Sequence, residues 1–306
     1  MRPDTQVCSR LMIPVLALIG AWVVLVGATA AEPPNLREYP KVDGSTTTQP
    51  LQQEIMKRVL KTAEADIRHS GTHHAYTRLI NGEVDFILVS RSPSQDELGE
   101  ARKKGVSLED KPIALNALVF IVHRHNPIES LTSEEIRGIF GGKIAAWDEV
   151  GVPGLGKIHA YTRERNSGSQ ELMERLVMPG SSIKPIPISP VIEGEGGRNL
   201  QENMWLLVSA VAGDECSLGY TLYHYATFIV PKLRDTVARN LRVIGVDSVE
   251  PSPTTIAART YPFTTSFVAV IRSNTPTGHP AVKIRDWLLT QEGKAVISDS
   301  HYVPHP

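Results

Sequence analysis

Three short turns rich in hydroxyl side chains, each placed directly before a helical pattern, constrain the fold of this chain most. They occupy residues 45–48, 70–72 and 167–169. After each turn the apolar residues recur at helical spacing, and Pro50 marks the start of the first helix. The first turn of a helix leaves backbone N–H groups unpaired and carries the positive end of the helix dipole, so each turn is a potential anion site. For any one turn taken alone, an ordinary N-cap is the alternative.

The stretch 161–172, YTRERNSGSQEL, predicts a strand end, a tight turn and the first turn of a helix. Gly168 lets the backbone approach a ligand, and the serines on either side of it add two hydroxyl donors. Arg163 and Arg165 place fixed cations beside this turn, and a guanidinium can donate two parallel hydrogen bonds to an oxyanion. The stretch therefore predicts an oxyanion site, with a capped helix and two solvent-facing arginines as the alternative.

Strand and helix patterns alternate along the chain, which predicts a mainly parallel α/β architecture. The continuous apolar run 84–89 is typical of a strand that is buried on both faces. Ser90 and Arg91 follow at its carboxyl end, where ligands bind in open α/β sheets. A solvated charge in a loop is the alternative for Arg91. The two long strand patterns at 112–125 and 261–272 predict a chain that crosses twice between two lobes.

The first 31 residues have the pattern of a secretory signal peptide. A basic stretch precedes the apolar run 11–28, and small residues follow this run. We expect cleavage after Ala30 or Ala31, which makes the protein periplasmic or secreted. The apolar run is long for a signal peptide, so an uncleaved membrane anchor is the alternative.

Charge and cysteine content exclude several classes of function. The formal net charge is −1, which argues against a nucleic-acid partner. Cys8 lies in the signal segment, so Cys216 has no partner for an internal disulfide.

Neither a carboxylate nor a cysteine stands at ligand spacing from His69, His73 and His74, and we predict no metal site. The pattern also offers no nucleophile–base pair, so we expect no cofactor and no enzymatic activity.

Beyond these local patterns, the chain resembles the periplasmic phosphate-binding proteins of ABC phosphate importers over nearly all of the segment after the signal peptide. Five stretches carry the resemblance: DGSTTTQPL at 43–51, SGTHHAYTRLINGEVDF at 70–86, SLTSEEIRGIFGGKIAAWDEVG at 130–151, TRERNSGSQE at 162–171 and LLTQEGKAVISDSHYVP at 288–304. The stretch at 130–151 is the most specific of them.

The resemblance implies an α/β fold of the two-lobed periplasmic-binding-protein type, type II. Each lobe would be a mainly parallel sheet flanked by helices, and two hinge crossings would join the lobes. After the signal peptide at 1–31, lobe I would comprise residues 38–116 and 262–306, and lobe II residues 117–261. The lobes would close around one buried oxyanion.

Carried over position by position, the resemblance implies ligand contacts from both lobes. These contacts come from Thr46, Thr47, Thr72, Arg163, Ser167, Gly168 and Ser169, and the strand-end argument adds Ser90 and Arg91. The family has an acidic residue where Arg91 stands. That residue accepts a proton from phosphate and so rejects fully ionised sulfate. With an arginine in its place, the choice between phosphate and sulfate is open.

We therefore predict an extracytoplasmic substrate-binding protein, acting as a monomer, that captures inorganic phosphate or a similar tetrahedral oxyanion. It would deliver the ligand to the membrane subunits of an ABC permease. One alternative is a stand-alone oxyanion scavenger or sensor component without transport. A second is an exported phosphatase, which would need a metal set or an activated nucleophile in the cleft.

Overall fold

The computed structural model describes residues 32–60, 68–163, 167–184 and 200–306 of the 306-residue chain. The predicted signal peptide at 1–31 and Arg165 lie outside these residues. Among the helices of the described part, none has both the length and the apolar character needed to cross a membrane.

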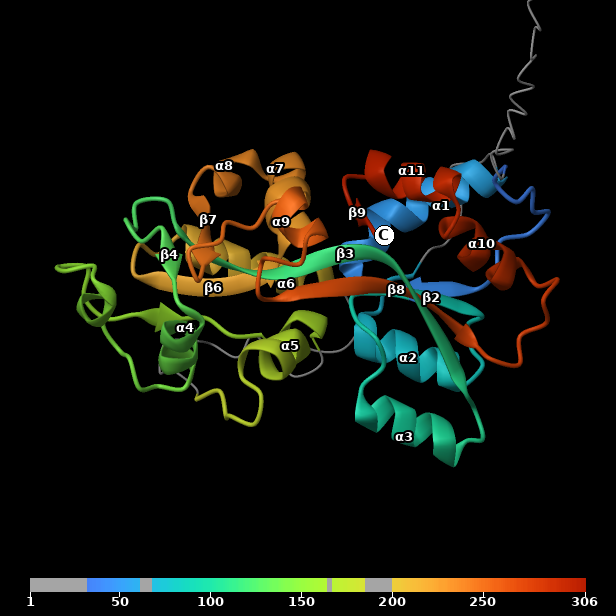
Figure 1. Ribbon diagram of the computed structural model, residues 1–306, viewed down its shortest axis with the longest axis horizontal. Coiled ribbons are helices and arrows are strands. Elements are labelled where there is room, and N and C mark those ends of the chain that lie inside the picture. Colours follow the sequence, from blue (N-terminus) through green and yellow to red (C-terminus); the bar gives the residue numbers. More distant parts are fainter. Residues whose placement is uncertain (1–31, 61–67, 164–166, 185–199) are drawn as a thin grey trace, which may run out of the picture. The chain divides into compact units, whose positions relative to one another are not determined.

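The described strands form one mixed sheet, in which six strands follow the order β1-β2-β8-β3-β6-β5 (Figure 1). Strands β4 and β7 pair with each other, β7 also pairs with β3, and β9 pairs with β3. The bounds are β1 Val42–Gly44, β2 Phe86–Val89, β3 Leu108–His123, β4 Ser130–Leu131, β5 His159–Ala160, β6 Ser217–Leu222, β7 Leu241–Val246, β8 Thr264–Arg272 and β9 Val303–Pro304.

The long strand β3 connects the two parts of this sheet. Its first part pairs with β8, from Leu108 opposite Arg272 to Ala117 opposite Thr264. Its last part pairs with β6 and β7, and every residue from 113 to 123 is buried. The apolar and β-branched residues of this stretch suit a strand with both faces covered. The two predicted long strands are confirmed as β3 and β8.

The predicted α/β class is confirmed, but the expectation of mainly parallel sheets is wrong for the long strands. Only β1–β2, β4–β7 and β5–β6 pair in parallel among the described strands. Strand β3 pairs antiparallel with each of its neighbours, and β2 pairs antiparallel with β8. Strands β3 and β8 lie side by side and run in opposite directions, so their ladder is antiparallel.

Helices flank the sheet, with α2 and α3 in one group near β2 and with α1, α10 and α11 in another (Figure 1). The predicted helix after residue 48 is confirmed as α1. The bounds are α1 Gln49–Leu60, α2 Thr72–Ile80, α3 Gln95–Lys103, α4 Ser133–Phe140, α5 Gly168–Leu172, α6 Leu200–Ala212, α7 Val230–Leu233, α8 Asp235–Ala238, α9 Pro253–Ala257, α10 Pro280–Leu288 and α11 Gln291–Asp299.

Local capping explains where several helices begin. The Thr132 side chain accepts a hydrogen bond from the backbone of Glu135, whose carboxylate accepts one from the backbone of Thr132, so a capping box begins α4. Thr290 caps α11 by accepting a bond from the backbone of Gly293. A Cβ at Gly293 would lie 2.2 Å from the carbonyl oxygen of Trp287, so only glycine allows α11 to turn this closely against α10.

The small apolar cluster beneath α2 fixes the end of β2. Ala75, Tyr76 and Leu79 of α2 pack there against Ile87 and Val89, together with residues of β8. The larger core surrounds β3. Because β2 is packed on both faces, the residues that follow it are held in place.

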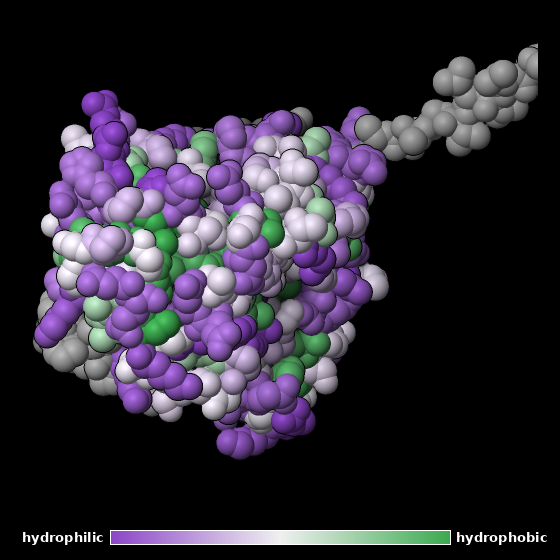
Figure 2. Space-filling view, turned by 60° about the vertical axis from the view of Figure 1, so that its left-hand side comes forward, coloured by the Kyte–Doolittle hydropathy of each residue, from purple (hydrophilic) through white to green (hydrophobic). Residues whose placement is uncertain are grey.

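Hydrophilic residues cover much of the face drawn in Figure 2, and apolar residues show between them.

Candidate functional site

Asp43, the middle residue of β1, joins the first two hydroxyl turns. It is fully buried, and its carboxylate accepts hydrogen bonds from the backbone of Gly44 at 2.7 Å and from the backbone and hydroxyl of Ser70 at 2.7 and 2.6 Å. Arg78 Nη1 donates to the same carboxylate at 2.6 Å. The sequence patterns assigned no role to Asp43, so this anchoring role was not predicted.

The turn at 45–48 is held closely against β2. The Ser45 and Thr47 hydroxyl oxygens lie 2.8 Å apart, and the Thr48 hydroxyl lies 2.8 Å from the carbonyl oxygen of Leu88. A Cβ at Gly44 would lie 2.3 Å from that carbonyl, which explains the glycine. Thr47 is buried, and the backbone of Thr46 belongs to the same single helical turn, Thr46–Thr48. The Thr46 side chain is not among those that the structure describes.

The second turn meets the end of β2. Thr72 is the first residue of α2, and its hydroxyl oxygen lies 3.0 Å from that of Ser90. Both residues are 1% exposed. The backbone of Gly71 donates to the carbonyl of Gly44 at 3.1 Å, which ties this turn to the first one. The parallel pairing of β1 and β2 therefore brings two of the predicted hydroxyl groups into contact.

The third turn, at the start of α5, packs directly on these two hydroxyls. Ser167 is the N-cap of α5, and its hydroxyl oxygen lies 2.9 Å from that of Ser169. A Cβ at Gly168 would lie 2.6 Å from Ser90 Oγ and 2.8 Å from Thr72 Oγ1. Only the absence of a side chain at position 168 permits this approach. The structure thus brings together five of the predicted residues from three separate segments.

Arg163 precedes this turn and is 9% exposed. Its backbone N–H donates to Tyr220 Oη at 2.9 Å and to Gln170 Oε1 at 3.2 Å, and Tyr220 also donates to Gln170. Burial raises the pKa of Tyr225 to about 12, while the positive charge of Arg163 acts in the opposite direction. The Arg163 charge is therefore held inside the protein, near Tyr225 and the start of α5. Gln170 and Tyr220 were not singled out from the sequence.

Arg91 follows Ser90, and the structure pairs its side chain with carboxylates. Its Nη1 and Nη2 atoms donate to the two oxygens of Glu97 at 2.7 and 2.9 Å, and Nη2 also contacts Glu171. The Arg91 and Glu97 side chains are 1% and 2% exposed. The guanidinium also lies 5.4 Å from the ring centre of Tyr76, close enough for a cation–π interaction. A contact of Arg91 with the ligand stays a prediction, whereas its role in joining these segments is visible.

Glu171 belongs to α5 and provides a second link between this helix and the end of β2. Its carboxylate pairs with Arg91, one residue beyond the Ser90 that Gly168 contacts. Burial raises the pKa of Glu171 to about 7, and Glu97 adds to this effect while Arg91 opposes it. The sequence indicated Glu171 only as a first-turn residue of a helix. Its partner stands 80 positions earlier, which no local pattern reveals.

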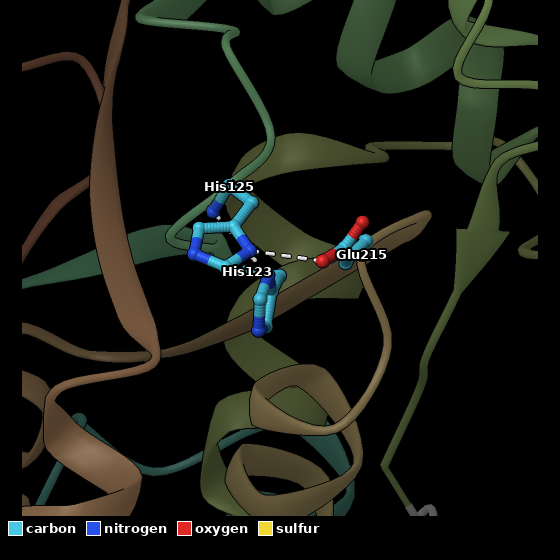
Figure 3. Close-up of side chains that lie close together, drawn as sticks. All are labelled: His123, His125 and Glu215. Atoms are coloured by element: carbon cyan, nitrogen blue, oxygen red, sulfur yellow. Dashed lines mark hydrogen bonds and ion pairs between the residues drawn. The ribbon is translucent and has the colours of Figure 1, made fainter.

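A group of possible metal ligands lies apart from these turns. In the described part of the chain, His123, His125 and Glu215 place their ligand atoms within 4.8 Å of one another (Figure 3). His125 Nδ1 lies 2.9 Å from Glu215 Oε1, and their side chains are 63% and 58% exposed. Two imidazoles and a carboxylate are suitable ligands for Zn²⁺. The group shares no residue with the hydroxyl turns. Of the histidines considered from the sequence, His73 contacts Glu97 at 3.2 Å.

Comparison with known proteins agrees with this architecture. The family model of the PBP superfamily domain matches residues 28–289. Among curated relatives, protein SphX of Synechococcus elongatus is 25% identical over 226 residues, which cover 71% of this chain and 62% of SphX. The phosphate-binding protein PstS of Staphylococcus aureus is 22% identical over 278 residues, which cover 89% of this chain and 80% of that protein.

Two solved structures show the same fold over most of their length. A Clostridium perfringens substrate-binding protein, assigned to a phosphate ABC transporter and solved with bound phosphate, has a TM-score of 0.68 and 24% identity, and the match covers 88% of this chain and 100% of that one. An ABC-type phosphate transport receptor of Vibrio cholerae has a TM-score of 0.62 and 20% identity, with 86% and 98% covered. The chain therefore belongs to the PBP superfamily and has its two-lobed α/β fold.

Proposed function

We propose that this protein is an extracytoplasmic substrate-binding protein that holds inorganic phosphate, or a similar tetrahedral oxyanion, between two lobes. Lobe I comprises residues 38–116 and 262–306, and lobe II comprises residues 117–261. The observation that carries the proposal is the approach of Gly168 to Ser90 and Thr72, because it joins a turn of lobe II to two hydroxyls of lobe I.

The chemistry of the converging residues suits a tetrahedral oxyanion. Hydroxyl groups and backbone N–H groups donate hydrogen bonds without carrying charge, and Arg163 supplies a buried positive charge beside them. Such donors bind an anion through directed hydrogen bonds, so the site needs no large net positive charge. The proposed ligand contacts come from Thr46, Thr47, Thr72, Ser90, Arg163, Ser167, Gly168 and Ser169. Arg91 contributes less to the ligand, because two carboxylates already offset its charge.

The related proteins support the ligand and the transport role. PstS of Staphylococcus aureus is named a phosphate-binding protein, and a Clostridium perfringens structure of the same fold contains phosphate. By analogy, this protein acts as a monomer that delivers its ligand to the membrane subunits of an ABC permease. Export directed by residues 1–31 places it in the periplasm or outside the cell. A receptor of this kind needs no catalytic chemistry.

Calorimetric titration of the purified protein with phosphate and, separately, with sulfate tests the proposal. We expect saturable binding of phosphate with one site per chain, because the three turns converge on a single place. The sulfate titration then measures how far the site distinguishes the two ions without an acidic residue at position 91. Absence of saturable binding for both ions would falsify the proposed function.

A further inference from the structure

The buried cluster around Arg91 contains two carboxylates for one guanidinium. Glu97 and Glu171 both contact Arg91, so the cluster carries a net charge of −1 when both carboxylates are ionised. An excess negative charge at a buried position is unfavourable, since the guanidinium can neutralise one partner only. One of the two carboxylates therefore has reason to bind a proton.

Of the two carboxylates, Glu171 is the more exposed to solvent, and its protonation would break fewer hydrogen bonds. Glu97 accepts two hydrogen bonds from Arg91 and one at 2.8 Å from the backbone of Ser94, and it contacts His73 at 3.2 Å. Its side chain is 2% exposed, whereas that of Glu171 is 24% exposed. Protonation of Glu97 would disrupt its paired bonds to Arg91, while protonation of Glu171 leaves the Arg91–Glu97 pair intact.

The position of Glu171 also places it next to the proposed ligand. Gly168 lies against Ser90, and Glu171, one helical turn later on α5, lies against Arg91. A doubly charged oxyanion held by Ser90 and the turn at 167–169 is therefore close to the Glu171 carboxylate. Two like charges at such a distance repel each other, and a proton on the carboxylate removes the repulsion.

We propose that Glu171 takes up a proton from solvent when an oxyanion binds beside Ser90 and the turn at 167–169, which couples ligand capture to pH. The inference rests on the proposed function and assigns a new role within the same site. Arg91 stays paired with Glu97 in both states, and the neutral Glu171 continues to contact Arg91 at the junction of the two lobes.

The charged and titratable groups around Glu171 agree with this direction. They are Arg91 and Glu97, His73 and Tyr76 from α2, and Arg175 from the segment that continues α5. Burial raises the pKa of Glu171 to about 7 and Glu97 raises it further, while Arg91, Arg175 and His73 lower it. Glu171 is thus largely ionised above pH 7 in the ligand-free protein. Binding that takes up a proton weakens as the pH rises, so we expect affinity to fall above pH 7.

The test is a calorimetric titration of the full chain with inorganic phosphate at pH 8, repeated in buffers that differ in their ionisation enthalpy. The dependence of the heat on the buffer gives the number of protons taken up. The ionisation of phosphate itself is the same for every variant, so a difference between variants belongs to the protein. We expect wild type to take up more protons than Glu171→Gln, by up to one per site. Between pH 7 and pH 9, we also expect the phosphate affinity of wild type to fall severalfold relative to that of Glu171→Gln.

One further variant serves as a control. Glu134→Gln makes the same chemical change at an exposed position in the first turn of α4. It should keep the wild-type proton uptake. Equal uptake by wild type and Glu171→Gln, with both binding phosphate, overturns this inference but leaves the proposed function standing. A wild type that binds neither phosphate nor sulfate overturns the proposed function instead.

A spectroscopic measurement on the unmodified protein covers the case in which Glu171→Gln does not fold. Infrared difference spectra recorded at pH 8, before and after phosphate is added to wild type, should show a new band of a protonated carboxyl group. Absence of that band at saturating phosphate contradicts proton uptake by a carboxylate.

Discussion

Arg91 and Arg163 both belong to segments that contribute to the candidate site, and we propose different roles for them. Both are buried, at 2% and 9% exposed. The guanidinium of Arg91 is paired with Glu97 and Glu171, and it joins the end of β2 to α3 and α5. The backbone N–H of Arg163 donates to Tyr220 and Gln170. Arg91 therefore acts as a structural connection between segments of the site, whereas Arg163 is the residue proposed to supply the charge for a ligand.

The comparison predicts that loss of Arg91 mainly affects stability. Arg91→Ala leaves Glu97 and Glu171 buried without their cation, and breaking a buried ion pair from one side costs about 3–5 kcal/mol of unfolding free energy. Denaturant unfolding monitored by circular dichroism measures this loss. The matched control is Arg58→Ala, because Arg58 forms an ion pair with Glu54 on an exposed face, at 3.0 Å with 42% and 31% of the side chains exposed. Such a pair contributes about 0–1 kcal/mol. Equal losses in the two variants would mean that Arg91 does not join these segments.

Loss of Arg163 should weaken ligand binding. Arg163→Ala removes the proposed charge for the ligand but leaves in place the backbone hydrogen bonds to Tyr220 and Gln170. A hydrogen bond to a charged group contributes about 1.5–3 kcal/mol, so phosphate affinity should fall roughly 10- to 100-fold. Calorimetric titration measures the affinity, and Arg165→Ala, which changes the other arginine of the same stretch, should lower it less. If the Arg165 variant loses as much affinity as the Arg163 variant, the assignment of the ligand charge to Arg163 is wrong.

Sequence patterns predicted the turns of the site well because each turn is a local feature. The hydroxyl residues at 45–48, 70–72 and 167–169 cap or precede helices, and such signals depend on neighbouring residues only. The long strands at 112–125 and 261–272 were predicted for the same reason. Their antiparallel pairing was not, since strand direction depends on how distant segments pack.

The partners of Arg91 could not be predicted in this way. Glu97 lies in a Ser94-x-x-Glu97 pattern, which indicates a capping box and says nothing of an arginine at position 91. Glu171 lies inside the stretch that first suggested an oxyanion site, yet its contact with Arg91 spans 80 residues. Asp43 is similar, because its hydrogen bonds to Ser70 cross 27 residues. Such contacts follow from the packing of β1, β2 and α5, which no local spacing encodes.

The contact of Gly168 with Ser90 and Thr72 provides the last test, which has the smallest expected effect. Gly168→Ala adds a Cβ that would lie 2.6 Å from Ser90 Oγ and 2.8 Å from Thr72 Oγ1, so α5 cannot approach β2 as closely. Overpacking of this kind costs about 1–2 kcal/mol, which corresponds to roughly a tenfold loss of phosphate affinity if binding needs the close approach. Gly278→Ala is the control, because a Cβ at Gly278 has no atom within 4 Å among the described residues, and its affinity should match wild type. A Gly168→Ala variant that binds phosphate as tightly as wild type would show that the ligand does not depend on this contact.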